Sequence, residues 1–245
     1  MAGRRAQPFD VQLASDFVLD DYARSLSLGA CIALHLRKHI INGELKPGDP
    51  LPEASVAKAF QTSRAPVRDA MRLLASEGLV ITASQSGNYI APISMDDVNT
   101  GSFIRSTLEE RNIMELAGTI TPTQLKRLGE IVAAQAAAIA DGAFASFHQL
   151  DEEFHHSLFD CAGRASVWDF LQSVKVHIDR ARTLTLSKGQ TAHQALADHE
   201  MIVKALQDGD PAAARLAMQQ HLDRIHSLVR SVTADLADCD QVIAQ

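Results

Sequence analysis

Three histidines and one aspartate in the second half of the chain have the residue types and spacing that suit metal coordination. Asp151 and His155 lie four residues apart, so a helix would place both on one face, which is otherwise apolar. His199 and His221 lie on the apolar faces of two later segments. Buried ionisable groups are costly unless compensated, and an N₃O donor set suits a divalent ion, zinc first, with nickel or manganese as alternatives. Hydrogen-bonded core histidines remain the other interpretation, because spacing alone does not show that the four side chains converge.

A second set of residues has the chemistry of nucleic-acid binding. Arg64, Arg68 and Arg72 recur every four residues on the outward face of a predicted helix over 63–77, and Ser63 precedes them. A guanidinium group can donate two hydrogen bonds to guanine or bind phosphate, and the first N–H groups of a helix attract phosphate. An ordinary amphipathic helix with solvated arginines would fit this spacing equally well.

The elements around these arginines follow a recognisable order. Apolar spacing predicts a helix over 27–42, which ends at Asn42-Gly43, and a turn over 46–50. A short helix over 53–60, the helix over 63–77 and two strand-like runs over 79–83 and 89–92 follow. This order predicts a winged helix-turn-helix domain over 26–92, whose second helix of the pair enters the major groove. Residues 1–25 are polar and aperiodic, and we expect a flexible arm.

The rest of the chain, 93–245, predicts helices throughout, so the expected fold class is mainly α. Its breaks contain Gly, Pro or Asp, as at Thr121-Pro122 and Gly209-Asp210-Pro211. The pattern predicts a six-helix bundle. The expected helices span 95–118, 122–141, 143–161, 164–187, 192–208 and 211–235.

Charge separates the two halves. The chain carries a net charge of −7. Residues 29–92 contain seven Lys and Arg against five Asp and Glu, whereas residues 93–245 contain 13 against 21. A mildly basic first domain beside an acidic second one fits DNA binding by the first alone. The three cysteines are scattered and no apolar run could span a bilayer, so we expect no disulfide, no membrane partner and a cytoplasmic location.

The amino-acid sequence of the first domain resembles that of the GntR family of bacterial regulators. Residues 41–53 (INGELKPGDPLPE) are similar to the opening motif of that family, and residues 63–80 (SRAPVRDAMRLLASEGLV) to its recognition helix. The resemblance implies that Arg64 and Arg68 contact bases or phosphates, that Ser63 contacts a phosphate, and that the wing tip, including Gly87 and Asn88, reaches the minor groove. Three departures stand out: Gln61-Thr62 replaces the usual Gly-Val, the wing loop over 84–88 has no Lys or Arg, and Ser55 stands where some members carry a basic DNA contact.

The second domain resembles the FCD effector module of FadR-like GntR regulators. The matching stretches are RSTLE at 105–109, LDEEFH at 150–155, DHEMI at 198–202 and MQQHL at 218–222. The resemblance implies that Asp151, His155, His199 and His221 hold a metal whose coordination a small carboxylate effector completes. It also implies that Arg105 pairs with the effector or braces Glu109, with Arg180 and Arg182 as weaker candidates for the cavity wall. A surface ion pair between Arg105 and Glu109 is the alternative.

These features together predict a homodimeric, ligand-responsive transcriptional repressor that binds a roughly palindromic operator. A regulator that senses its ligand without a metal is the first alternative. A zinc enzyme is the second, although the chain lacks a His-Glu-x-x-His motif, and we expect no catalysis.

Overall fold

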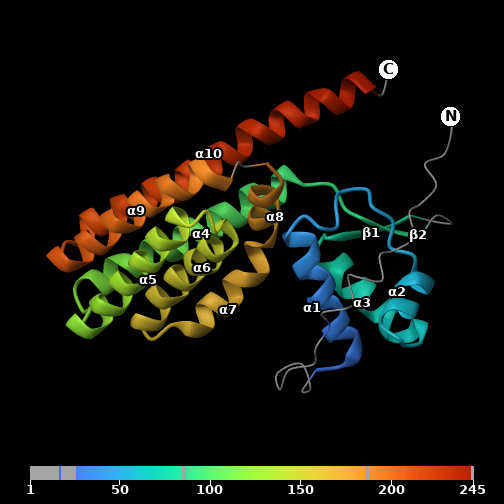
Figure 1. The fold of residues 1–245 in the computed structure, drawn as a ribbon, viewed down its shortest axis with the longest axis horizontal. Coiled ribbons are helices and arrows are strands. Elements are labelled where there is room, and N and C mark those ends of the chain that lie inside the picture. The colour runs from blue at the N-terminus through green and yellow to red at the C-terminus, as the bar shows by residue number, and fades with distance from the viewer. Residues whose placement is uncertain (1–16, 18–25, 84–86, 186–187, 244–245) are drawn as a thin grey trace. The chain divides into compact units, whose positions relative to one another are not determined.

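The structure, a computed structural model, describes Phe17 and residues 26–83, 87–185 and 188–243 (Figure 1). The chain divides into two compact units, Met1–Ser94 and Met95–Gln245, and each is described by itself. Most of the predicted arm over 1–25 lies outside the described residues. Phe17 packs its ring edge-on against His35 and Phe60, at centroid distances of 5.3 and 4.9 Å.

The first unit has the predicted winged helix-turn-helix order. Helix α1 (Leu28–Ile41) begins at Ser27, whose side chain accepts a hydrogen bond from the Ala30 N–H, and its buried face packs on α3. Helices α2 (Glu53–Ala59) and α3 (Arg64–Ser76) form the helix pair. Strands β1 (Val80–Ala83) and β2 (Gly87–Ile90) pair antiparallel as the wing. The predicted order of elements is confirmed, and the second strand begins and ends two residues earlier than the predicted run over 89–92.

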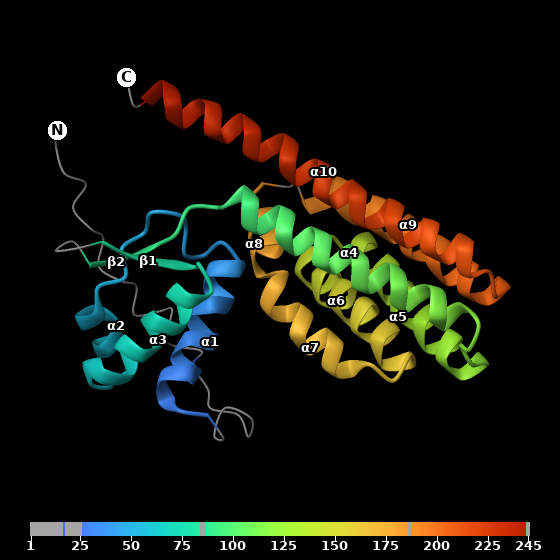
Figure 2. The same cartoon turned by 180° about the vertical axis from the view of Figure 1, so that it is seen from behind.

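The second unit is entirely helical in its described part (Figure 2). Its helices are α4 (Met95–Ala117), α5 (Pro122–Ala140), α6 (Phe144–Cys161), α7 (Ala165–Val174), α8 (Val176–Thr185), α9 (Lys188–Asp208) and α10 (Pro211–Ile243). Local sequence sets the starts: Thr121 and Gln124 form a capping box at α5, and Pro122 occupies its first turn. None of the helices in the described part of the chain is long and apolar enough to cross a membrane.

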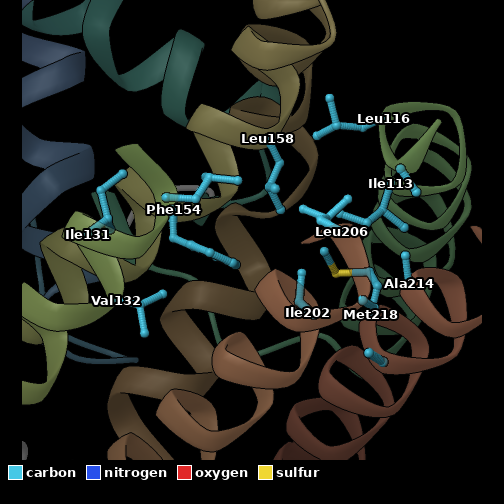
Figure 3. Packing of buried hydrophobic residues seen from close by; sticks show 14 of the residues in the cluster. Ile113, Leu116, Ile131, Val132, Phe154, Leu158, Ile202, Leu206, Ala214 and Met218 are labelled. Carbon is cyan, nitrogen blue, oxygen red and sulfur yellow. The ribbon is translucent and has the colours of Figure 1, made fainter. Parts of the chain in front are cut away.

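An apolar core joins five of these helices, α4, α5, α6, α9 and α10. Phe154 and Leu158 of α6 lie among Leu116 of α4, Ile202 of α9 and Met218 of α10, and all five are buried (Figure 3). Burial of this apolar surface is the main force holding the helices together. The same face of α6 carries Asp151 and His155, so the core also fixes the predicted metal ligands in place.

The prediction of six helices was wrong at one position. The single helix expected over 164–187 is two helices, α7 and α8, with the break at Lys175. The sequence has no Gly or Pro there, so the cause is tertiary. The carbonyl of Val174 faces Gly101 of α4 so closely that a Cβ on Gly101 would lie 2.6 Å from its oxygen. The side chain of Lys175 is buried in ion pairs with Glu152 and Asp179.

Replacing Gly101 should test this close approach. Gly101→Ala should lower the free energy of unfolding by about 1–3 kcal/mol, because the new methyl group would press on a backbone carbonyl and on Ile178. The matched control is Gly129→Ala in α5, where nothing lies within 4 Å of the added Cβ. That control should raise stability by about 0.5–1 kcal/mol, the usual helix preference for alanine. Denaturant unfolding followed by the fluorescence of Trp168, the single tryptophan, measures both, and equal shifts would contradict the packing described.

Candidate functional site

The recognition-helix arginines lie on the exposed face of α3. Arg64, Arg68 and Arg72 are exposed, whereas Val67, Ala70, Met71 and Leu74 of the opposite face are buried. Nη2 of Arg68 lies 3.5 Å from Oε2 of Glu53, and Nη1 of Arg72 lies 2.8 Å from Oδ1 of Asp69. Exposed ion pairs of this kind are weak, so these guanidinium groups can exchange a carboxylate for a phosphate at little cost.

The start of α3 suits an anion. Ser63 is the exposed N-cap residue, and its side chain makes no capping hydrogen bond. The first N–H groups of a helix have no partner within it, and the positive end of the helix dipole adds to their attraction for phosphate.

The wing presents only part of its predicted contact surface. Gly87 is exposed, with φ of 101°. Asn88 is buried, and its Oδ1 accepts a hydrogen bond of 2.8 Å from Oγ1 of Thr82 on the paired strand. The side chain of Asn88 therefore stabilises the hairpin rather than lying on its surface. Residues 84–86 of the wing loop, which include Ser86 of the tip, lie outside the described residues.

The four predicted metal ligands come together. Asp151 and His155 of α6, His199 of α9 and His221 of α10 are all buried, and their candidate ligand atoms lie within 4.8 Å of one another. The convergence that spacing alone left open is thus present in the structure.

Each histidine of this cluster also faces an acceptor on its outer side. Nδ1 of His155 lies 2.5 Å from Oε2 of Glu109, and Nδ1 of His199 lies 2.9 Å from Oε1 of Gln135. These acceptors assign the proton to Nδ1 and leave the Nε2 lone pair facing the cluster. Nε2 of both rings is buried and has no hydrogen-bond partner among the described residues. Buried polar atoms are nearly always satisfied, so these two nitrogens fit metal ligands held by outer hydrogen bonds.

His221 has a comparable outer neighbour. Its Nδ1 lies 3.4 Å from Oδ2 of Asp198, without the alignment of a hydrogen bond. Arg224 in turn donates to both carboxylate oxygens of Asp198, at 3.2 and 2.9 Å. Asp198 is therefore held in place beside the third imidazole.

The protonation states of Asp151, His199 and His221 match those that a metal requires. Burial lowers the pKa of His199 well below its usual value, and the neighbouring His221 lowers it further. Burial likewise lowers the pKa of His221, against the opposing effect of Asp198. Burial alone would raise the pKa of Asp151, but Arg182 and the histidines hold it well below its usual value. Neutral imidazoles and an ionised carboxylate are the forms that bind divalent ions.

Arg105, the predicted effector residue, lies beside this cluster rather than at the surface. Its side chain is buried, and Nε donates to Oε1 of Glu109 at 2.6 Å. The alternative of a surface ion pair was therefore wrong. Glu109 bridges Arg105 and His155, and both raise the stability of its charged form, so its pKa lies far below the usual value despite burial. Nη2 of Arg105 is buried and has no hydrogen-bond partner among the described residues.

Sequence reasoning missed the outer partners. Glu109 was predicted only as the partner of Arg105, and neither Gln135 nor Asp198 was assigned a role. A signal for Gln135 did exist, since it is the polar residue in the otherwise apolar run over 131–140. Asp198 precedes His199 directly but reaches across to His221 of the next helix.

Comparison with known proteins decides the family. Residues 28–90 match the family described as bacterial regulatory proteins, gntR family, and residues 102–224 match the FCD domain. The chain belongs to the GntR family. It is a DNA-binding transcriptional regulator with an FCD effector domain, as its resemblance to FadR-like members predicted.

Several regulators are similar to this GntR chain over most of its length. The HTH-type transcriptional repressor RspR of Escherichia coli K12 is 35% identical over 203 residues, which cover 83% of this chain and 89% of that protein. The HTH-type transcriptional regulator LutR of Bacillus subtilis is 28% identical over 215 residues, or 78% and 95% of the two chains. Among solved structures, E. coli McbR/YncC shares the fold with a TM-score of 0.70 at 17% identity, covering 84% of this chain and 98% of that one.

The turn before α3 explains one departure from the GntR pattern. Gln61 has a φ of 50°, in the left-handed region that glycine adopts without strain. The glycine that family members usually carry there is thus the residue this backbone favours. Gln61 keeps the turn at a cost of roughly 1–2 kcal/mol of backbone strain.

The buried bridge at Glu109 generates a stability prediction. Glu109→Gln should lower the free energy of unfolding by about 3 kcal/mol or more, because it leaves the buried charge of Arg105 without its carboxylate. Glu130→Gln is the matched control: its partner Lys126 is exposed, and the change should cost less than about 0.5 kcal/mol. Both are measured by denaturant unfolding followed through Trp168. A Glu109→Gln protein as stable as the control would show that the bridge contributes nothing.

Proposed function

We propose that this GntR regulator is a metal-dependent repressor whose FCD domain binds one divalent ion through Asp151, His155, His199 and His221. The observation that carries the proposal is the pair of buried Nε2 atoms of His155 and His199, which face the cluster without a hydrogen-bond partner among the described residues. Outer contacts from Glu109, Gln135 and Asp198 support it, because metal-binding imidazoles are held in this way.

The ligand of the FCD domain is, in this proposal, a small carboxylate. When bound, the ion supplies a Lewis-acidic centre to which a carboxylate oxygen can coordinate. The four protein donors would hold zinc, nickel or manganese, and the effector carboxylate would complete the coordination. Arg105 is the proposed partner of a second effector oxygen, since Nη2 of its buried guanidinium has no acceptor in the described part of the chain.

DNA binding is assigned to α3 and the wing. Arg64, Arg68 and Arg72 enter the major groove, and Ser63 with the first N–H groups of α3 binds a phosphate. Gly87 approaches the minor groove, whereas the buried side chain of Asn88 supports the wing from inside. Each chain supplies one recognition helix, so the proposed homodimer reads a two-fold operator.

The proposed regulatory output is repression that the effector relieves. RspR, the E. coli relative, is named a repressor, and the present chain is similar to it over 203 residues. Effector binding in the FCD domain would lower operator affinity, and coupling of this kind typically amounts to about 1–3 kcal/mol.

Metal content tests the central proposal. Purified tag-free protein dialysed against zinc should hold one ion per chain, and His199→Ala should lose it. Gln135→Leu, which removes only the outer partner, should weaken zinc binding by about 10- to 100-fold. His193→Ala is the matched control, because His193 is an exposed histidine on the same helix. Elemental analysis and zinc titration measure the effect. A wild-type protein that retains no zinc, nickel or manganese would favour the metal-free sensor instead.

Substitutions on α3 test the DNA proposal. Arg64→Ala and Arg68→Ala should each weaken specific operator binding by about 1–3 kcal/mol. Arg127→Ala, an exposed arginine of the FCD domain, should have no effect. Fluorescence anisotropy at fixed salt with a fragment that the wild-type protein protects gives the affinities, and footprinting shows whether the site has two half-sites. In a reporter strain the two α3 variants should raise expression; lower expression would make the chain an activator.

A further inference from the structure

The carboxylate needed for the proposed metal is already engaged by an arginine. Arg182 of α8 is largely buried, with its side chain 13% exposed, and its Nη1 lies 3.1 Å from Oδ2 of Asp151. Its Nη2 lies 3.2 Å from Nδ1 of His148. The other oxygen of Asp151, Oδ1, lies 3.6 Å from Nε2 of His199. Asp151 thus stands between the histidine cluster and one buried cation.

The two oxygens of Asp151 face different groups, Oδ1 the histidines and Oδ2 Arg182, and a bound ion would draw the carboxylate toward the histidines. The four candidate ligand atoms spread over as much as 4.8 Å. Metal–ligand bonds of about 2.0–2.2 Å in a tetrahedral site bring donor atoms to roughly 3.4 Å from one another, so the donors must draw together. The contact of 3.1 Å with Arg182 is already longer than the usual charge-assisted hydrogen bond of about 2.7–2.9 Å. Moving Asp151 toward the histidines would lengthen it further.

The charges around the site also disfavour a divalent ion and Arg182 at Asp151 together. Three cations, Arg105, Lys175 and Arg182, lie among four carboxylates, those of Glu109, Asp151, Glu152 and Asp179. Apart from the imidazoles, four negative and three positive groups leave a net charge of −1, which a divalent ion would change to +1. The ion and the guanidinium of Arg182 would also repel each other across Asp151.

We propose that Arg182 is the internal counter-cation of the metal-free site, that a divalent ion displaces it from Asp151, and that the released guanidinium then anchors an anionic ligand. A buried guanidinium displaced from Asp151 loses its hydrogen-bonded carboxylate oxygen, and Nη2 of the neighbouring Arg105 already lacks an acceptor in the described residues. The ligand class that this chemistry recognises is a small carboxylate. The inference rests on the proposed metal function and adds that the metal creates the anion site.

Zinc affinity separates displacement from the opposite role. If Arg182 competes with the ion for Asp151, Arg182→Gln should bind zinc at least about 10-fold more tightly than the wild type, since a like charge near the site is removed. If Arg182 instead orients Asp151 for the metal, the same change should weaken binding by about 10- to 100-fold, which would overturn the inference. An unchanged affinity would overturn it as well. Arg127→Gln, in an exposed ion pair of the same unit, is the matched control and should leave zinc affinity unchanged.

Two further measurements keep the test decisive. Arg182→Lys retains the charge, so it should bind zinc within about threefold of the wild type even if Arg182→Gln is too unstable to purify without metal. In the wild-type protein, the guanidinium NMR signal of Arg182, identified by its loss in Arg182→Lys, should change on addition of zinc. A signal that stays constant while zinc binds would show that Arg182 remains on Asp151. A wild-type protein that binds no divalent ion removes the proposed metal site itself, which is a different result.

The anion site has its own readout. Acetate, used as the probe, should raise the melting temperature of zinc-loaded wild-type protein and leave that of metal-free protein unchanged. In zinc-loaded Arg182→Gln the apparent acetate affinity should fall by at least about 10-fold, because a charge-assisted contact is lost. An equal response with and without zinc, or no response in either form, would overturn the anion-anchor assignment.

Discussion

The desolvation of three imidazoles and a carboxylate inside an apolar core is the constraint on which the FCD domain depends. The ring of His199 stacks on that of Phe154, with ring centroids 4.2 Å apart. His155 directly follows Phe154 on α6. Polar groups in such surroundings cost several kilocalories per mole unless each finds a partner. The partners come from different helices: Glu109 from α4, Gln135 from α5 and Asp198 from α9. The polar centre therefore fixes the relative positions of helices that apolar packing alone would constrain only loosely.

Local periodicity explains which parts of this centre could be predicted from sequence. Asp151 and His155 share a face because they lie four residues apart, and His221 follows the apolar positions of its own helix. The outer partners have no such local signal, since Glu109 lies 46 residues before His155 and Gln135 lies 64 residues before His199. Arg105 and Glu109 lie four residues apart, which is as typical of a surface pair as of a buried one. Only the tertiary structure shows that this pair is buried.

In the DNA-binding unit, too, the features that could be predicted are those set by local spacing along the chain. The two faces of α3 separate as its spacing predicted, because an amphipathic helix has only one way to bury Val67, Met71 and Leu74. The sequence analysis placed Asn88 at the tip of the wing, whereas the structure buries its side chain, and the strand pattern contains the reason. Side chains alternate along a strand, so Asn88 lies on the same face as buried Ile90, two residues further on. A family contact carried over by position overlooked that alternation.

A regulator also needs an element whose contacts differ between its ligand states, because a ligand shifts an equilibrium only through differential interaction. Under the proposed function, the charged contacts between α6 and α8 would meet this requirement. Asp151 and Glu152 of α6 face Arg182 of α8 and Lys175 at its start, and Asp151 is one of the four proposed metal ligands. A change at Asp151 therefore changes what holds α8, while Gly101 lets α4 approach the start of α8 within contact distance. If a ligand changes the affinity for operator DNA by some factor, bound DNA must change the affinity for the ligand by the same factor.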